Sequence, residues 1–184
     1  MRTLFTLILV VIFGHTQLQA QEGGFEPNQN KHEFRLDALE ILTIPKLEIN
    51  YEYVNNKYSG FGAAISLTLE EDYDFQEKFS FTPYYRQYFL NKKDYGARGL
   101  FVEGMLRLAG GVNEELTFDS NTGFSTSVEE NWFDLGAGLA VGQKWVSENG
   151  FVFELSFGGG RYLLDSKADD FFLRGGVLIG YRFF

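Results

Sequence analysis

The chain has 184 residues, a formal net charge of −9, no cysteine, three prolines, 21 glycines and an aromatic content of 17%. Without cysteine, neither a disulfide framework nor a thiolate metal site can form, and the acidic balance argues against nucleic-acid binding through a basic patch. Many aromatic residues and glycines with few prolines favour strands joined by tight turns over helices or disorder.

The first 20 residues have the layout of a secretory signal peptide. A basic start is followed by an apolar run from Leu4 to Phe13 and by a small-residue region that ends at Ala20. This run is shorter than the roughly 20 residues that a membrane-spanning helix requires, so a retained anchor is the weaker alternative. The sequence therefore predicts Sec-dependent export with removal of residues 1–20, a short tail over 21–30, and one domain over 31–184.

Eight segments of the domain alternate between apolar and polar residues with the period of a strand. They cover residues 32–43, 46–54, 60–70, 77–89, 98–109, 132–145, 150–163 and 172–183. Each is about the 9–11 residues of a tilted membrane strand or longer, and most connections are alternately short and long. This pattern predicts the all-β class: an eight-stranded antiparallel up-and-down transmembrane β-barrel. The connection at 44–45 is unexpectedly short for an outer loop and is the weakest point of the strand count.

The two faces of these strands differ in chemistry. One face is apolar and gathers aromatic residues near one end of the strands: Tyr51, Tyr53, Phe61, Tyr85, Phe89, Trp145, Phe151, Tyr181 and Phe183. Aromatic bands of this kind are typical of a membrane interface, and Phe79, Trp132 and Phe133 could begin a second band at the other end. The opposite face carries small residues and charges of both signs, which suits the narrow interior of an eight-stranded barrel. A soluble lipocalin-type barrel, apolar inside and polar outside, is the alternative architecture.

Charged residues in such an interior need partners. The expected pairs on neighbouring strands are Arg35 with Glu52, Arg86 with Glu103, Arg107 with Asp134, and Arg182 with Glu33 across the closure of the barrel. A network of arginines and carboxylates would hold the register of the strands and leave no open channel.

Several segments resemble an uncharacterised outer-membrane barrel family of Bacteroidota. They are HEFRLDAL (32–39), EINYEY (48–53), FSFTPYYRQYF (79–89), FVEG (101–104) and GYRF (180–183). The resemblance covers essentially all of 31–184 and implies a small barrel similar to the OmpA and OmpX types. The expected location is the outer membrane of a Gram-negative bacterium, and the pattern of short turns and longer loops predicts that both termini are periplasmic. Such barrels usually end on one aromatic residue that the barrel-assembly machinery reads. Here the assembly signal would comprise Tyr181, Phe183 and Phe184, with either phenylalanine as the terminal aromatic.

Catalysis is not expected. Outer-membrane lipid A deacylases and acyltransferases use a histidine with a serine and an acidic residue, but the domain has one histidine, His32, at the predicted periplasmic rim. One histidine and no cysteine exclude a typical zinc site. Carboxylates in 70–74 and 165–170 could hold Ca²⁺, but solvated loops are the favoured interpretation. No metal and no cofactor are therefore expected.

The stretch 110–131 is either a binding loop or an extended hairpin, and the hairpin is favoured. The expected function is a structural or surface-interaction role in the outer membrane, with membrane lipid and the assembly machinery as partners. Two alternatives stay open: a barrel that binds a small lipid-like ligand and, with less support, a lipid-modifying enzyme. Nothing in the sequence identifies a surface partner or an oligomeric state.

Overall fold

The computed structural model of the chain describes residues 31–43, 45–69, 77–89, 96–118, 125–164 and 170–183, with the backbone alone over 114–118 and 125–128. The elements are β1 (His32–Asp37), α2 (Ala38–Thr43), β2 (Lys46–Asn56), β3 (Ser59–Thr68), β4 (Glu77–Phe89), β5 (Gly99–Phe118), β6 (Ser125–Val146), β7 (Phe151–Tyr162) and β8 (Phe171–Phe183). The expectations for the signal peptide, the tail, Phe184 and the loop carboxylates at 70–74 and 165–169 lie outside the described residues.

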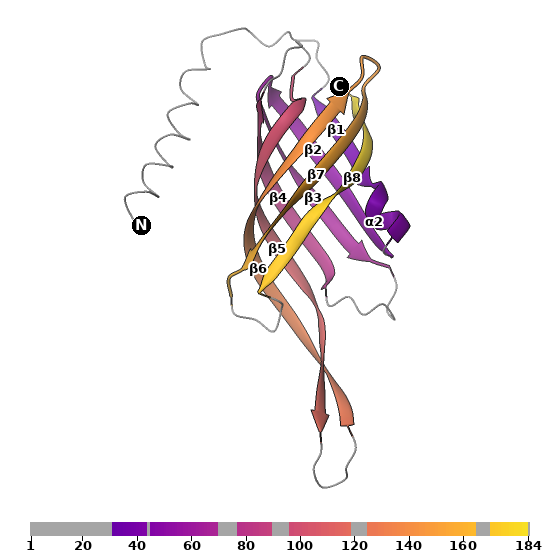
Figure 1. Ribbon diagram of the computed structural model, residues 1–184, viewed down its shortest axis with the longest axis vertical. Helices are drawn as coiled ribbons and strands as arrows, with labels where there is room; N and C mark the ends of the chain where they lie inside the picture. Colours follow the sequence, from indigo (N-terminus) through magenta and orange to yellow (C-terminus); the bar gives the residue numbers. More distant parts are fainter. Residues whose placement is uncertain are drawn as a thin grey trace, which may run out of the picture.

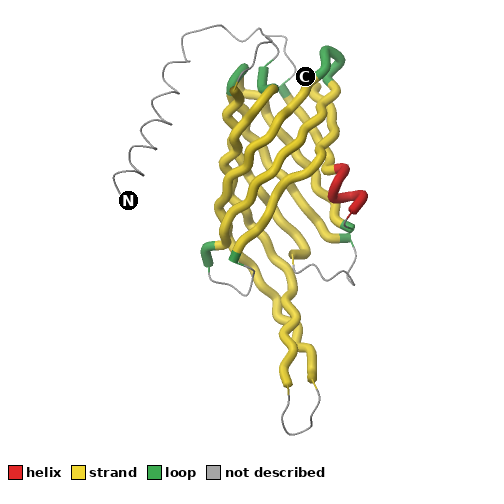
Figure 2. Tube along the Cα trace, in the orientation of Figure 1, coloured by secondary structure: helices red, strands yellow, loops and turns green. Residues whose placement is uncertain are grey.

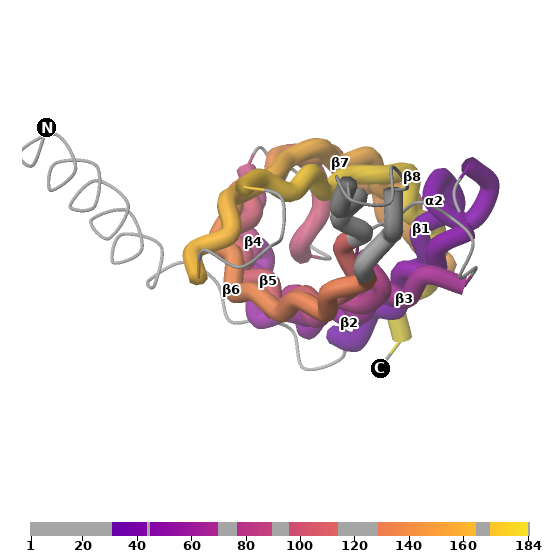
Figure 3. The backbone as a smooth tube through the Cα atoms, turned by 90° about the horizontal axis from the view of Figure 1, so that it is seen from below, coloured from indigo at the N-terminus to yellow at the C-terminus, as the bar shows by residue number. Residues whose placement is uncertain are grey.

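The strands form one closed antiparallel barrel in which each strand pairs with the next along the chain (Figures 1 and 2). The closure joins β8 to β1, with Glu33 opposite Arg182 and Asp37 opposite Leu178. Seen from below, the strands make a continuous ring (Figure 3). The predicted fold class, an eight-stranded up-and-down barrel, is therefore confirmed.

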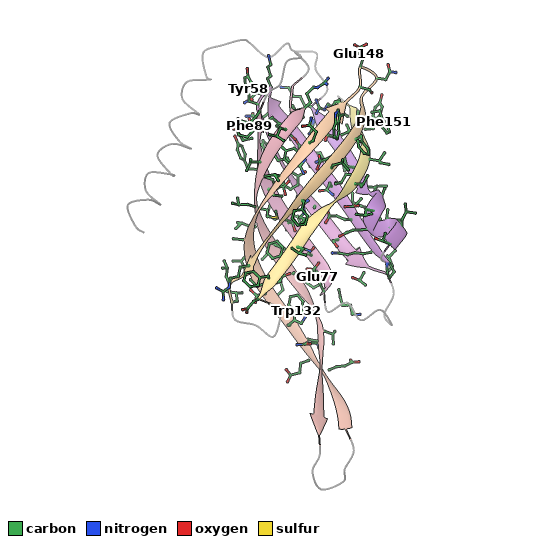
Figure 4. All side chains as sticks on the ribbon, in the orientation of Figure 1. Tyr58, Glu77, Phe89, Trp132, Glu148 and Phe151 are labelled. Carbon is green, nitrogen blue, oxygen red and sulfur yellow. The ribbon has the colours of Figure 1, made fainter. Side chains whose placement is uncertain are left out.

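The two ends of the barrel differ. The described chain begins and finishes at one end, called here the terminal end, which also carries the short turns at 57–58 and 147–150. Tyr58, Phe89 and Phe151 lie at this end (Figure 4). Rings of adjacent strands contact one another in the aromatic band; Phe34 and Phe183 stack at 5.6 Å between centroids across the closure. The opposite end is called the loop end.

Apolar side chains cover the outer surface of the barrel. Leu139, Phe157 and Leu173 are 67%, 69% and 77% exposed, and they project outward because strand side chains alternate between the two faces. Trp132, expected in a second aromatic band, was wrongly assigned to this surface. It is only 8% exposed and packs edge-on against Tyr162 in the interior, since it lies on the opposite face of β6 from its exposed neighbour Phe133.

The first predicted strand ends six residues early. Residues 38–43 form the short helix α2, which lies on the side of the barrel (Figure 2), instead of the second half of a strand. The register pairs Leu36 with Ile49, so β2, which begins at Lys46, could accompany β1 for only about three more residues. A helix lets the remaining residues satisfy their own backbone groups. No helix in the described part of the chain is long and apolar enough to cross a membrane.

Asp37 starts this helix. Its Oδ1 accepts hydrogen bonds from the backbone N–H groups of Leu39 (2.9 Å) and Glu40 (3.1 Å), which is the arrangement of an N-terminal helix cap. Leu39, Ile41 and Leu42 are exposed on the helix, so the outer surface stays apolar where the strand is interrupted.

The stretch 110–131 is mostly a hairpin. Beyond Gly111 and Trp132, β5 and β6 continue as a two-stranded ribbon, from the pair Val112 and Asn131 to the pair Phe118 and Ser125. We call residues 112–118 and 125–131 the β5–β6 ribbon. Figure 1 shows it projecting from the loop end, well clear of the other strands. The described residues of this stretch therefore form the extended hairpin that was favoured over a binding loop.

Candidate functional site

A network of charged side chains fills the middle of the barrel. Strand alternation turns one face of every strand inward. Taken together, these inward faces contribute equal numbers of cations and carboxylates to the network. They are the five cations Arg35, Arg86, Lys144, Arg174 and Arg182 and the five carboxylates Glu33, Glu48, Glu52, Glu103 and Glu154. None of these side chains is more than 8% exposed. We call this group the central network.

Arg86 of β4 contacts three carboxylates at once. Its Nε donates to Glu103 at 2.6 Å, and Nη1 donates to Glu52 at 2.9 Å. Nη1 and Nη2 both donate to Glu154, at 2.8 and 3.0 Å. The partners belong to β5, β2 and β7, so a single guanidinium crosses the interior and links strands that are not neighbours.

Aromatic residues support this guanidinium. The Cζ atom of Arg86 lies 4.3 Å from the ring centroid of Phe101 and 4.5 Å from that of Tyr84. A cation over an aromatic face gains attraction from the ring, more so where water is excluded. Planar stacking and forked hydrogen bonding are both properties of arginine that lysine does not share.

Arg35 of β1 contacts two of the carboxylates that Arg86 also contacts, Glu52 and Glu154. Its guanidinium donates to Glu52 at 2.8 Å and to the Tyr84 hydroxyl oxygen at 2.8 Å, and it also contacts Glu154. Its Nε is 3.1 Å from Glu33. Arg35 therefore ties the closing strand to β2, β4 and β7.

Lys144 of β6 completes this part of the network. Its Nζ donates to Glu33 at 3.1 Å and to Glu52 at 3.0 Å. The Tyr88 hydroxyl donates to the same Glu52 at 2.6 Å, and the Lys144 ammonium lies 4.6 Å from the Tyr88 ring centroid. Glu52 is thus shared by four donors, which is how a fully buried carboxylate stays satisfied.

Arg182 closes the interior at the terminal end. It is 2.8 Å from Glu33 and donates to the backbone carbonyl oxygens of Gly96 (2.7 Å) and Ala97 (2.8 Å). Ala97 is itself completely buried and packs in a small apolar cluster with Val54, Tyr88 and Phe101. Gly96 and Ala97, just before β5, therefore lie in the barrel mouth and are held there by an arginine of the last strand.

A second polar group lies toward the loop end. Arg107 donates to Glu77 through Nε (3.1 Å) and Nη2 (2.5 Å), and the Tyr162 hydroxyl donates to the same carboxylate at 2.9 Å. Lys46 bridges Glu77 at 3.3 Å and Glu40 at 3.5 Å. Two cations thus face two carboxylates, and this group, like the central network, is balanced in charge.

A cluster of buried aromatic and apolar side chains lies inside this half of the barrel. Its members are Tyr84, Met105, Ala109, Trp132, Ala140, Tyr162 and Phe172. The Arg107 guanidinium lies 5.1 Å from the Phe172 ring centroid, so the cluster contacts the second polar group directly. The described interior is therefore packed with side chains at both ends and in the middle.

Three of the four expected interior pairs form. The structure brings together Arg35 with Glu52, Arg86 with Glu103, and Arg182 with Glu33. The expected pair of Arg107 with Asp134 was wrong: Arg107 pairs with Glu77, and Asp134 accepts the backbone N–H groups of Leu163 and Leu164 at 3.2 and 3.0 Å. The register sets Arg107 opposite Gly136, which leaves Asp134 one inward position nearer the loop end.

Sequence reasoning missed Lys144 and Glu77. Lys144 could have been predicted from the strand alternation, because it lies two residues from Gly142 and therefore on the same inward face of β6. Glu77 could not have been predicted in this way, because the alternation places it on the same face as the exposed Phe79. A register shift between the two residues turns Glu77 toward the interior. A bulge of this kind re-aims a side chain without any sequence signal.

His32 lies at the terminal end, as expected from its position in the sequence. Its Nδ1 is within hydrogen-bond distance of the Tyr51 hydroxyl (2.8 Å), and its ring packs edge-on against Tyr53 at 5.4 Å. Both partners belong to the aromatic band. Within the described residues, no group of three or more histidines and carboxylates is arranged to hold a metal ion.

These features define a closed, eight-stranded antiparallel barrel of the outer-membrane type, with a charged interior and an apolar exterior. The fold is similar to the crystal structure of the N-terminal β-barrel domain of Pseudomonas aeruginosa OprF, with a TM-score of 0.58 and 12% sequence identity. The match covers 84% of this chain and 98% of that one. No protein-family model matches the chain, and no curated protein matches its sequence. At this level of identity the likeness concerns the fold alone.

Proposed function

We infer that the protein is an integral outer-membrane barrel with a structural or surface-interaction role, without catalysis and without a wide pore. The observation that carries this inference is the inverted polarity of the barrel. Ten charged side chains are buried in the central network, while large apolar side chains such as Phe157 and Leu173 project outward. Spanning a bilayer is the setting in which this arrangement is stable, because a closed barrel pairs its backbone groups and presents its apolar surface to lipid.

The inverted polarity also argues against the soluble ligand-binding barrel. An apolar surface that surrounds the whole barrel far exceeds the few hundred Å² of contiguous apolar patch on a typical soluble monomer. A lipid-like ligand would need an apolar interior, whereas this one holds arginines, glutamates and a lysine in contact with one another.

The packed interior supports the absence of a wide pore. Arg86 and Arg35 reach across the barrel to Glu154, and Arg182 holds the segment at Gly96 and Ala97 in the mouth at the terminal end. An ion entering the interior would have to separate buried pairs, which costs several kcal/mol for each charge left uncompensated.

The orientation that we propose places the terminal end in the periplasm and the β5–β6 ribbon outside the cell. Short periplasmic turns and longer outer loops are the rule in such barrels. The ribbon then carries the acidic residues Glu129 and Glu130 away from the membrane surface, where a partner could meet it.

Cell fractionation combined with a heat-shift gel tests the membrane assignment. We expect the chain in the outer-membrane fraction, with a folded band that migrates differently after boiling; recovery as a soluble periplasmic protein would end the proposal. A protease site inserted between Phe118 and Ser125 should be cut on intact cells. Planar bilayers that contain the refolded chain should show no stable open channel.

A further inference from the structure

The outer surface of β7 and β8 carries an apolar groove near the loop end. Its floor is the backbone of Gly158–Gly160 and its walls are the side chains of Phe157, Phe171 and Leu173. Arg161 lines the same groove, which has a volume of about 640 Å³. The groove is shallow and open to the surroundings, and it combines an apolar lining with one cation.

Strand alternation explains the shape of the groove. Phe157 and Arg161 project outward from β7, and Gly159 lies between them on the same face without a side chain, so the space there is bordered by Leu173 of β8, whose Cδ2 would be 3.3 Å from a Cβ at Gly159. A Cβ atom at Gly159 would lie 2.6 Å from the backbone carbonyl oxygen of Phe172, so the close approach of the two strands requires glycine there. The stretch between Phe157 and Arg161, in which β7 itself has no outward side chain, is about 13 Å long at the rise of a strand.

Arg161 lies where the groove meets the loop end. It is opposite Phe171, the first residue of β8, and its side chain is 63% exposed. Its ion pair with Asp170 is long, at 3.7 Å, and its guanidinium is 5.7 Å from the Phe171 ring centroid. An exposed ion pair of this kind contributes little, so a stronger anionic ligand can replace Asp170.

We propose that this groove binds one acyl chain of a membrane lipid whose phosphate headgroup pairs with Arg161. The inference rests on the proposed membrane function and names a partner for the lipid-facing surface. The apolar walls suit a hydrocarbon chain that lies along the barrel. The guanidinium offers a planar pair of donors that matches a phosphate, and an arginine near the end of a membrane segment places its charge at the interface. Charge complementarity and apolar lining thus select the same class of ligand.

Native mass spectrometry of the purified chain in an uncharged detergent tests the proposal. The probes are dimyristoylphosphatidic acid and dimyristoylglycerol, which share their acyl chains and differ in the phosphate. We expect the wild-type chain to retain one equivalent of the phosphatidic acid and about tenfold less of the diacylglycerol. Arg161→Gln should lower retention of the phosphatidic acid about tenfold to the level of the diacylglycerol.

Matched variants separate the groove from the rest of the surface. Leu173→Trp fills the groove and should lower retention of both probes. Leu67→Trp changes an outward leucine of β3, four strands away from β7 in the barrel, and should leave retention unchanged. Arg98→Gln removes a cation at the terminal end and is the control for charge. Equal retention of the phosphatidic acid by wild type and Arg161→Gln would overturn the headgroup assignment, and equal retention by Leu173→Trp would overturn the groove.

The same samples distinguish failure of this inference from failure of the proposed function. Each variant is first checked for the heat-shifted band that marks a folded membrane barrel. A wild-type chain without that band would contradict the membrane function itself. A folded wild-type chain that retains neither probe would contradict the lipid site and leave the membrane function standing.

Discussion

Arg86→Met should destabilise the barrel strongly. The substitution keeps an apolar stem of similar length but removes the guanidinium that contacts Glu52, Glu103 and Glu154. Four cations would then face five carboxylates in the central network. Removing one partner from a buried ion pair costs about 3–5 kcal/mol, because the remaining charge is left uncompensated. With a urea slope of about 2 kcal/mol per molar, a loss of that size lowers the unfolding midpoint by about 2 M.

A double substitution tests whether charge balance is the cause. Glu154→Met alone leaves five cations facing four carboxylates and should cost a similar amount. Arg86→Met with Glu154→Met restores the balance, so the double variant should be more stable than the sum of the single effects by about 1–3 kcal/mol. The exposed Arg161→Met is the control and should change the unfolding free energy by less than about 0.5 kcal/mol.

Urea titration of the chain refolded into vesicles measures these effects, with the fluorescence of Trp132 and Trp145 as the readout and a heat-shift gel as an independent one. A loss below about 1 kcal/mol for Arg86→Met would show that water or neighbouring groups compensate Glu52, Glu103 and Glu154. Strictly additive single effects would refute the coupling between Arg86 and Glu154. Either result would contradict the view that the balanced network holds the barrel together.

Four further predictions concern other parts of the molecule. Brominated acyl chains should quench the fluorescence of Trp145 in a Trp132→Phe variant, but should leave Trp132 unquenched in Trp145→Phe, because one ring faces outward and the other inward; the reverse result would mean that the faces are misassigned. Asp37→Ala should lower the unfolding free energy by about 0.5–2 kcal/mol through loss of the helix cap, while Asp37→Asn should nearly preserve it. Replacing 113–130 by a two-residue turn should leave the heat-shifted band intact, since the ribbon pairs only with itself in the described structure; loss of the band would show that the ribbon supports the barrel. Phe183→Ala should reduce the folded fraction in cells more than in refolding from urea, if the assembly machinery reads this residue; equal losses in both assays would indicate a purely structural role.

The strand count and the facing of the strands could be predicted because alternation is a local property. Phe79, Phe81 and Tyr85 share one parity and are all exposed, whereas Arg86 has the other parity and is buried. A side chain of a regular strand has only two directions to take. The difference in composition between alternate positions was therefore enough to separate the apolar outer surface from the interior. The even number of strands and the alternation of turns then favoured a closed up-and-down barrel.

Two departures from regular strands, at 38–43 and at Glu77, could not be predicted from the local sequence. Residues 38–43 alternate well enough to continue a strand, but β2 begins too late to accompany more than the first two of them, and Asp37 caps a helix instead. In the strand alternation Glu77 has the position of an outward-facing residue, yet a register shift turns it toward Arg107. In both places the decisive quantity is the position of a neighbouring strand, which the local sequence does not record.

By itself, the sequence determined which side chains face inward along the regular parts of the strands and that their charges need partners within the barrel. Only the tertiary structure decided which charges meet. The expected partners were on adjacent strands, and Arg86 does reach Glu103 of β5, but it also reaches Glu154 of β7, and Lys144 of β6 reaches Glu52 of β2. The reason is physical: closing eight strands brings opposite walls within the length of an arginine or lysine side chain, so pairing follows distance across the interior and not order along the chain.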